Sequence, residues 1–249
     1  MKNLRGILIF IGGIMTYLLF LVLFGFMVGF NYNLWRYSVS FGSTKLSIYD
    51  FNVINFIIDI VLISIFGISH STLARQSAKR KLKQYIPNKL IRTLYVLIAV
   101  ITLFLLVLLW RPIGGVIYDL RSTIWGFLLM GVSLFGLGLL FISTWLISHF
   151  RLFGVAQTYS EFSGTNLEPL DFQTPSLYNY VRHPLYTGFL LFFWFTPLMT
   201  ITQVVFATGM TVCILIGTYF EEKDLVASFQ EQYQNYKLNV PYRYVPGLI

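Results

Sequence analysis

The chain has 249 residues, of which 56% are hydrophobic and only 11% are charged, and its mean hydropathy is +0.70. A soluble globular domain carries about 25% charged residues, so this composition excludes a soluble enzyme and indicates a polytopic membrane protein. The formal net charge of +8 requires no nucleic-acid partner, because basic residues on one face of a membrane meet anionic lipid headgroups.

Four hydrophobic runs are each long enough for a spanning helix of roughly 20 residues. They cover residues 6–30, 49–69, 91–110 and 124–147. The first run lacks an A-x-A-like cleavage site after a short apolar core, so we expect it to be a span of the mature protein rather than a signal peptide.

A fifth hydrophobic block, 185–220, is too long for one helix and barely long enough for two. Pro197, followed by the polar Thr200, Thr202 and Gln203, offers a turn near its middle. We therefore predict a short helical hairpin of about 185–199 and 202–220. The expected fold is an all-α membrane bundle of six spans, with five spans plus a re-entrant piece as the alternative.

The most basic stretch of the chain joins the second and third spans. It contains Arg75, Lys79, Arg80, Lys81, Lys83, Lys89 and Arg92. Since cytoplasmic loops retain Lys and Arg, this loop is predicted to face the cytosol, which leaves fourteen of the eighteen basic residues inside. We expect a multi-pass protein of the bacterial inner membrane with cytoplasmic N- and C-termini.

The chain contains one cysteine, Cys213, which lies within an apolar run. The sequence therefore predicts neither a disulfide nor a thiol metal site, and we assign no metal ligands. It shows no internal repeats or low-complexity linkers, so we expect one domain over residues 1–249. Many transporters are built from matched repeat halves, and their absence from the sequence disfavours a transporter.

Two pairs of charged residues bracket the predicted hairpin. Arg182 and His183 precede its first helix, and Glu221 and Glu222 end its second, so both pairs are expected at the same membrane face. Pro184 suits a first helical turn, the amide end of a helix favours anions, and Arg182 presents a bidentate fork. These groups suit a zwitterion with hydroxyls, such as S-adenosylmethionine. The alternative is that the basic pair contacts headgroups and the acids begin a solvated helix.

The stretch YNYVRHPLYTGFLLFFWFTP, followed by EEKDLVASFQEQYQNYKLNVPYRYVP, resembles the C-terminal signature of integral-membrane methyltransferases. That group includes isoprenylcysteine carboxyl methyltransferase and phospholipid N-methyltransferases. Upstream, SHSTLAR, WRPIGGVIYDL and HFRLFGVAQTY are similar to the methanethiol S-methyltransferase branch, also described as NnrU-like. The resemblance covers most of the chain from about residue 60. Gln230 departs from it, because related tails often have Gly after the Phe.

The resemblance implies that the hairpin and tail, residues 185–249, bind S-adenosylmethionine from the cytosol. The cofactor-site residues implied by motif position are Tyr178, Arg182, His183, Pro184, Tyr186, Gly188, Glu221 and Glu222, with Gln157 as a weaker addition. The resemblance also implies methanethiol as the acceptor and dimethyl sulfide as the product. The expected partners are this small thiol and membrane lipids, and we predict no protein partner. The alternatives are a prenylcysteine or phospholipid acceptor, or a non-catalytic NnrU-like membrane factor.

A thiol reacts as its thiolate, so the site should offer either a base or a positive environment. The candidates for the base are His70, Tyr186 and Glu222. His70 lies at the end of the second span, where it is equally suited to cap carbonyls or to face headgroups. His149 is a further candidate, with an interfacial position as its alternative. Asp59 lies about three helical turns before His70. It either serves a proton path or faces substrate, or it is a neutral, hydrogen-bonded packing carboxyl.

Overall fold

The computed structural model describes residues 2–32, 51–168 and 171–247. This part of the chain is mainly helical. Its helices are α1 (Lys2–Asn31), α2 (Val53–Ala74), α3 (Gln76–Leu82), α4 (Asn88–Leu109), α5 (Ile124–Ile147), α6 (His149–Leu152), α7 (Val155–Ser163), the 3-10 helix η1 (Ser176–Asn179), α8 (Pro184–Trp194) and α9 (Ile201–Asn239). Two short strands, β1 (Val116–Asp119) and β2 (Leu198–Thr200), complete it.

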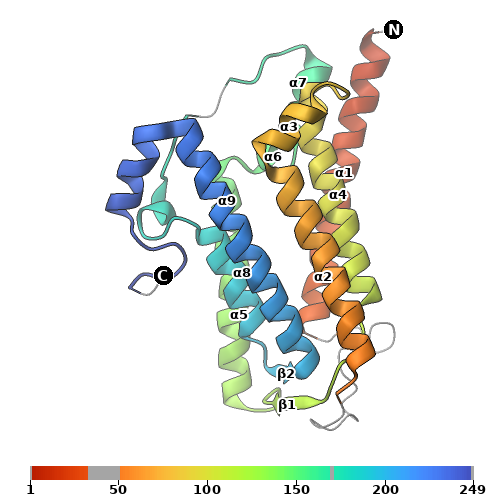
Figure 1. The fold of residues 1–249 in the computed structure, drawn as a ribbon, viewed down its shortest axis with the longest axis vertical. Coiled ribbons are helices and arrows are strands. Elements are labelled where there is room, and N and C mark those ends of the chain that lie inside the picture. The colour runs from red at the N-terminus through yellow and green to blue at the C-terminus, as the bar shows by residue number, and fades with distance from the viewer. Residues whose placement is uncertain (1, 33–50, 169–170, 248–249) are drawn as a thin grey trace.

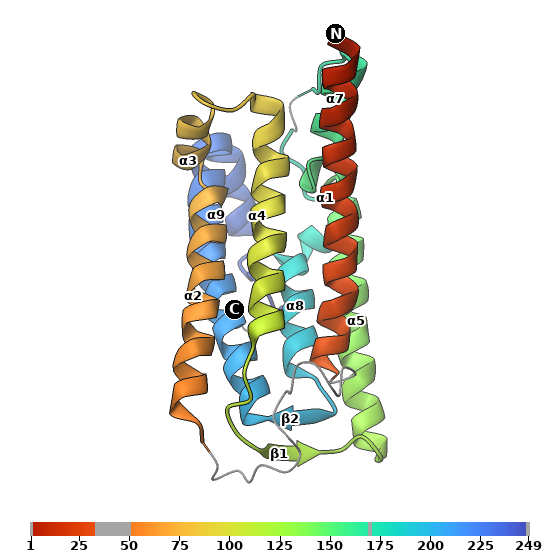
Figure 2. The ribbon, with the colours of Figure 1, turned by 90° about the vertical axis from the view of Figure 1, so that its right-hand side faces the viewer.

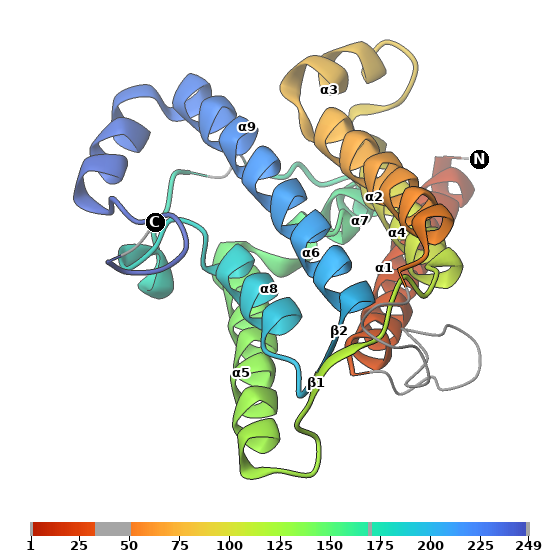
Figure 3. The same cartoon turned by 60° about the horizontal axis from the view of Figure 1, so that its bottom comes forward.

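Five of the described helices are long and apolar enough to cross a membrane, namely α1, α2, α4, α5 and α9. Figures 1 and 2 show them running along the long axis of the molecule, and Figure 3 shows the shorter α8 between α5 and α9. α8 has 11 residues, which span about 16 Å, roughly half of a hydrocarbon core. The all-α membrane fold is confirmed, and the helix count matches the alternative of five spans plus a shorter piece.

Capping side chains fix where two of the spans begin. The Asn52 side chain accepts the backbone amide of Asn55 at 2.9 Å, and Thr123 Oγ1 accepts that of Gly126 at 3.2 Å. Each bond satisfies an amide that has no partner within its own helix. The predicted run 124–147 coincides with α5.

The two ends of the bundle differ. At one end, which we call the strand end, β1 and β2 form an antiparallel pair. At the other, which we call the α3 end, lie α3, α6 and α7 (Figure 1). The turn predicted near Pro197 is confirmed, because α8 stops at Trp194 and Thr200 Oγ1 caps α9 by accepting the Gln203 amide at 3.0 Å.

Side chains of other helices donate hydrogen bonds to a backbone carbonyl in the last turn of α8. The Phe192 carbonyl oxygen accepts from Asn31 Nδ2 at 2.8 Å and from Ser133 Oγ at 3.1 Å. Gln203 Nε2 in turn donates to Asn31 Oδ1 at 2.6 Å, and all four residues are buried. An unsatisfied carbonyl in lipid costs several kcal/mol, so this network allows α8 to end inside the bundle.

Small residues allow the helices of the hairpin to pack closely. A Cβ at Gly188 of α8 would lie 2.5 Å from the carbonyl oxygen of Gly136 of α5. A Cβ at Gly209 of α9 would likewise meet Ile63 of α2. Close approach at small residues is a usual way of joining membrane helices. Gly188, which the resemblance placed at the cofactor site, therefore packs against α5.

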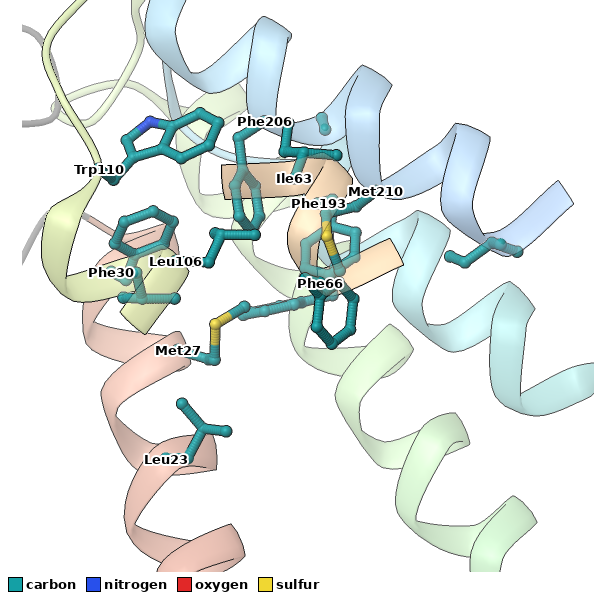
Figure 4. Close-up of a cluster of buried hydrophobic side chains, with 14 of the residues drawn as sticks. Leu23, Met27, Phe30, Ile63, Phe66, Leu106, Trp110, Phe193, Phe206 and Met210 are labelled. Carbon is teal, nitrogen blue, oxygen red and sulfur yellow. The ribbon is translucent and has the colours of Figure 1, made fainter. Parts of the chain in front are cut away.

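The apolar core lies where α1, α2, α4, α8 and α9 meet (Figure 4). Its labelled side chains are Leu23, Met27, Phe30, Ile63, Phe66, Leu106, Trp110, Phe193, Phe206 and Met210. This core fixes the hairpin against the first spans.

α9 continues beyond the core and bends sharply at the α3 end (Figure 1). The bend is at Gln230, whose φ is 45° and ψ is −117°, at the position where related tails often have Gly. Beyond it, Tyr233, Tyr236 and Val240 pack with Phe172 into a separate apolar cluster. The bend returns the C-terminal tail to the start of α8.

Candidate active site

The tail lies directly on the start of α8. The backbone amides of Arg182 and His183 donate to the carbonyl oxygens of Tyr242 at 3.0 Å and Arg243 at 2.9 Å. Pro184 follows at the first helical position, as expected from the sequence. These two amides therefore hold the tail and are not open to a ligand anion.

The Arg182 guanidinium is engaged within the protein. Its Nε donates to Glu222 Oε1 at 2.7 Å, and its Nη1 donates to the carbonyl oxygens of Val240 at 2.7 Å and Pro241 at 2.6 Å. The residue is only 6% exposed. The fork that the sequence suggested for a ligand carboxylate thus binds α9 and the tail instead.

Glu222 forms a buried cluster with Arg182 and His183, and two partly exposed cations lie at its edge. Besides Arg182, its carboxylate lies 3.3 Å from His183 Nε2, 3.7 Å from Lys237 Nζ and 3.4 Å from Arg243 Nη2. These partners come from the start of α8, the far end of α9 and the tail. The carboxylate that we considered as a base therefore joins three segments, and its oxygens are occupied by the protein's own groups.

Glu221 has the opposite environment. Adjacent helical residues point about 100° apart, so Glu221 can be exposed although Glu222 is buried. The Glu221 carboxylate accepts a hydrogen bond from the Tyr186 hydroxyl at 2.8 Å. Burial raises the pKa of the nearby Tyr178, and the negative charge of Glu221 raises it further. The Tyr178 carbonyl accepts the Tyr236 hydroxyl at 2.6 Å. An open carboxylate and a phenol thus stand beside the buried cluster.

His70 of α2 forms a hydrogen bond with Tyr95 of α4. The Tyr95 hydroxyl of α4 is 3.0 Å from His70 Nε2, and Arg92, also on α4, interacts electrostatically with Glu221 and Tyr186. Sequence reasoning did not single out Arg92 or Tyr95 as candidates. Their spacing of three positions, which places both on one helix face, was the available signal.

Three other residues that the sequence singled out lie outside this arrangement. Gln157 of α7 donates to a carbonyl of α6 at 3.0 Å. His149 is bonded at both ring nitrogens by hydroxyls from α1 and α5. Asp59 accepts the backbone amide of Arg111 at 2.9 Å. Each of these contacts connects structural elements of the bundle.

The chain is similar to curated proteins over most of its length. It is 38% identical over 229 residues to the methanethiol S-methyltransferase of Crocosphaera subtropica, covering 92% of this chain and 88% of the relative. It is 36% identical over 237 residues to that of Mycobacterium tuberculosis, covering 95% and 96%. Nurim of Rattus norvegicus is more distant, at 26% over 179 residues, 67% of this chain and 66% of the relative. No family model matches the chain, and no solved structure matches it.

The apolar helices and these relatives define the class, which is a multi-pass membrane methyltransferase. Within that class, the chain belongs to the methanethiol S-methyltransferase family. The resemblance found in the sequence is confirmed at this level. An enzyme of this class requires a methyl donor and a place to bind it.

Proposed function

We propose that this chain methylates methanethiol, with S-adenosylmethionine as the methyl donor, to give dimethyl sulfide and S-adenosylhomocysteine. The main support from the structure is the Tyr186–Glu221 pair, an open carboxylate and phenol beside the buried cluster that fixes the hairpin and tail. The support from comparison is the similarity to curated methanethiol S-methyltransferases.

The groups around this pair fit a cationic ligand that carries hydroxyls. The Glu221 carboxylate can attract positive charge and accept from hydroxyl groups. The Tyr233 hydroxyl is buried and, within the described residues, has no hydrogen-bond partner, so it is available as a donor. We assign Glu221, Tyr186 and Tyr178 to hold the methyl donor, with Tyr233 beside them. When bound, S-adenosylmethionine supplies an electrophilic methyl group on a positively charged sulfur.

We assign a positioning role to the buried cluster. Methyl transfer mainly requires alignment, with the reacting atoms about 3 to 3.5 Å apart. Arg182, His183 and Glu222 hold the tail against the start of α8, and the His183 ring lies 5.6 Å from that of Tyr186. This contact fixes the phenol that borders the proposed donor site. Pro184 sets the position from which α8 begins.

We propose that the α3 end faces the cytosol, with both termini inside and the protein in the bacterial inner membrane. The support is the positive charge of α3, which carries Lys79, Arg80 and Lys81 and suits the cytoplasmic face. The donor site then opens to the compartment that contains a water-soluble donor. A neutral, apolar product such as dimethyl sulfide can leave through the bilayer.

A lipid or prenylcysteine acceptor would need an opening toward the bilayer at the site. The described part of the chain has an open groove of about 600 Å³ between α1 and the start of α4. It is lined by Leu4, Arg5, Leu8, Ile9, Pro87 and Leu90. This groove includes none of the site residues on α8 and α9. We propose the small thiol as the acceptor because the curated relatives that cover most of the chain are methanethiol S-methyltransferases.

Headspace gas chromatography on detergent-purified protein given S-adenosylmethionine and methanethiol tests the proposal. Wild type should release dimethyl sulfide, and Glu221→Gln should lower both product formation and donor affinity measured by calorimetry. Glu231→Gln, the same change at an exposed position further along α9, should leave both unchanged.

Two results would overturn the proposal. Donor binding without dimethyl sulfide would exclude methanethiol and direct the search to prenylcysteine and phospholipid acceptors. A folded wild-type protein that does not bind S-adenosylmethionine would favour a non-catalytic membrane factor.

A further inference from the structure

A second polar pair lies on α2 and α4. The Tyr95 hydroxyl is 3.0 Å from Nε2 and 3.2 Å from Nδ1 of His70. The imidazole also stacks on Phe66 of the same helix, with ring centroids 5.3 Å apart. His70 and Tyr95 are each half-buried. The His70–Tyr95 pair is therefore held in place but retains exposed surface.

Arg92 lies one turn before Tyr95 on α4. Its guanidinium carbon is 5.1 Å from the centroid of the Tyr95 ring, and its Nε donates to the Leu152 carbonyl oxygen at 2.7 Å. Within the described residues, its two terminal nitrogens have neither a hydrogen bond nor an ion pair. The side chain is thus anchored at one nitrogen and presents the other two.

Charged and titratable groups from four other helices interact electrostatically with Arg92. They are His70 of α2, Lys79 of α3, Tyr186 of α8 and Glu221 of α9. The guanidinium therefore lies within electrostatic range of both the His70–Tyr95 pair and the Tyr186–Glu221 pair. Segments far apart in the sequence bring these two pairs toward one another.

The alternative is that this polar pair simply joins the two spans, as polar side chains between membrane helices often do. Cross-helix bonds elsewhere in this bundle, such as Tyr17 with His149 and Tyr32 with Ser133, join helices in this way. The His70–Tyr95 pair differs from them because the guanidinium of Arg92 lies over the Tyr95 ring. Within the described residues, Arg92 is hydrogen-bonded only through its Nε, so its terminal nitrogens are available for a role beyond helix packing.

Building on the function proposed above, we propose that Arg92 and the His70–Tyr95 pair form the acceptor end of the site. Arg92 stabilises the thiolate of the acceptor. His70 takes the thiol proton, and Tyr95 is a positioning residue that orients the imidazole. The two ends then have complementary charge, with Glu221 toward the cationic donor and Arg92 toward the anionic acceptor.

The proton step is simple. The S–H bond of the thiol breaks heterolytically, and the electron pair stays on sulfur beside the guanidinium. The proton goes to a ring nitrogen of His70 and from there to water at the α3 end. Since only the thiolate is a good nucleophile, a cation at this position raises the reactive fraction of a weakly acidic thiol.

Thiols of different acidity test the role of Arg92. In detergent-purified protein, Arg92→Gln should lower kcat/KM for methanethiol by about 100-fold at pH 7 and move its pH profile upward by about one unit. With thiophenol, which is far more acidic, the loss should be less than about 5-fold, because this thiol is largely ionised without help. Arg92→Lys keeps the charge and should retain most of the activity.

Tyr95→Phe tests the positioning role. Removing the hydroxyl should lower kcat for methanethiol by about 10-fold and change the pH profile, since the imidazole loses its orientation. Affinity for S-adenosylmethionine, measured by calorimetry, should stay unchanged. Tyr32→Phe is the matched control, because that hydroxyl bonds Ser133 away from the site, and it should leave the pH profile as in wild type.

The inference is overturned if Arg92→Gln loses equal activity with both thiols, or if its pH profile does not move. It is also overturned if Arg92→Lys or Tyr95→Phe lowers donor affinity together with activity, since these residues would then support the donor site. Should Arg92→Gln fail to fold, the lysine and phenylalanine variants decide the matter. Failure of the proposed function is distinct, because the wild type itself would then release no dimethyl sulfide.

Discussion

The carboxylates of Glu221 and Glu222 are adjacent in the chain but lie in opposite environments. Glu222 Oε1 is 2.7 Å from Nε of Arg182, with both side chains buried, whereas Glu221 is exposed and accepts the hydroxyl of Tyr186. The two acids therefore have different roles. One holds the tail on α8, and the other faces outward beside it.

Glu222→Gln should loosen the tail. The change leaves the buried Arg182 guanidinium without its counter-ion, which costs about 3–5 kcal/mol of unfolding free energy. Thermal unfolding in detergent and limited proteolysis of the tail measure the effect. Glu221→Gln should change stability by less than about 0.5 kcal/mol, and equal losses in the two variants would contradict the division of roles.

Gln230→Gly should stabilise the protein. Gln230 has a φ of 45° and a ψ of −117°, a conformation that glycine adopts without the penalty of a side chain, so relieving the strain should gain about 1 kcal/mol. Gln234→Gly, on the helical stretch that follows, should instead lose about 1 kcal/mol. Chemical denaturation in detergent compares the two, and a loss in both would show that the bend carries no strain.

Gly188→Ala should disturb the contact between α5 and α8. The new Cβ would lie 2.5 Å from the Gly136 carbonyl oxygen, so the helices must separate, at a cost of about 1–3 kcal/mol. Gly138→Ala is the control, since a Cβ there meets no atom within 4 Å. The melting temperature of Gly188→Ala should fall below that of the control, and equal values would contradict the close contact.

Protonation of His149 should lower the stability of the folded protein in mild acid. Burial lowers the pKa of His149 from its usual value of 6.5, so the unfolded chain binds the proton more tightly than the folded one. Its contribution is complete above about pH 6.5 and is lost as the pH falls toward the folded pKa. Melting temperatures from pH 7.5 to 5 should fall more steeply in wild type than in His149→Gln, and parallel slopes would refute the assignment.

The hairpin could be predicted from the sequence because its signals are local. A long apolar block, the turn after Pro197 and the cap at Thr200 together indicate two helices whose charged ends meet. The buried position of Glu222 could not be predicted, because it depends on the rotational phase of α9 and on the return of the tail. The same return occupies Arg182, which by itself suggests an anion site.

Arg92 and Tyr95 illustrate a second limit of sequence reading. Both lie near the start of a span, where basic and aromatic residues are common, so neither stands out alone. Their proximity to His70 arises only when α2 packs beside α4. At Gln230 the sequence did give a signal, because related tails often have Gly at this position. The structure bends there even without Gly, and the apolar cluster that follows holds the bend in place.

The short length of α8 has a consequence for how the protein is made. With 11 residues, α8 is too short to cross a bilayer by itself. Its Phe192 carbonyl is satisfied by Asn31 of α1 and Ser133 of α5, and both helices leave the ribosome before α8 does. The earlier helices therefore provide the polar side chains of Asn31 and Ser133 within the bilayer. We expect α8 to enter the membrane by packing against these helices rather than by partitioning into lipid.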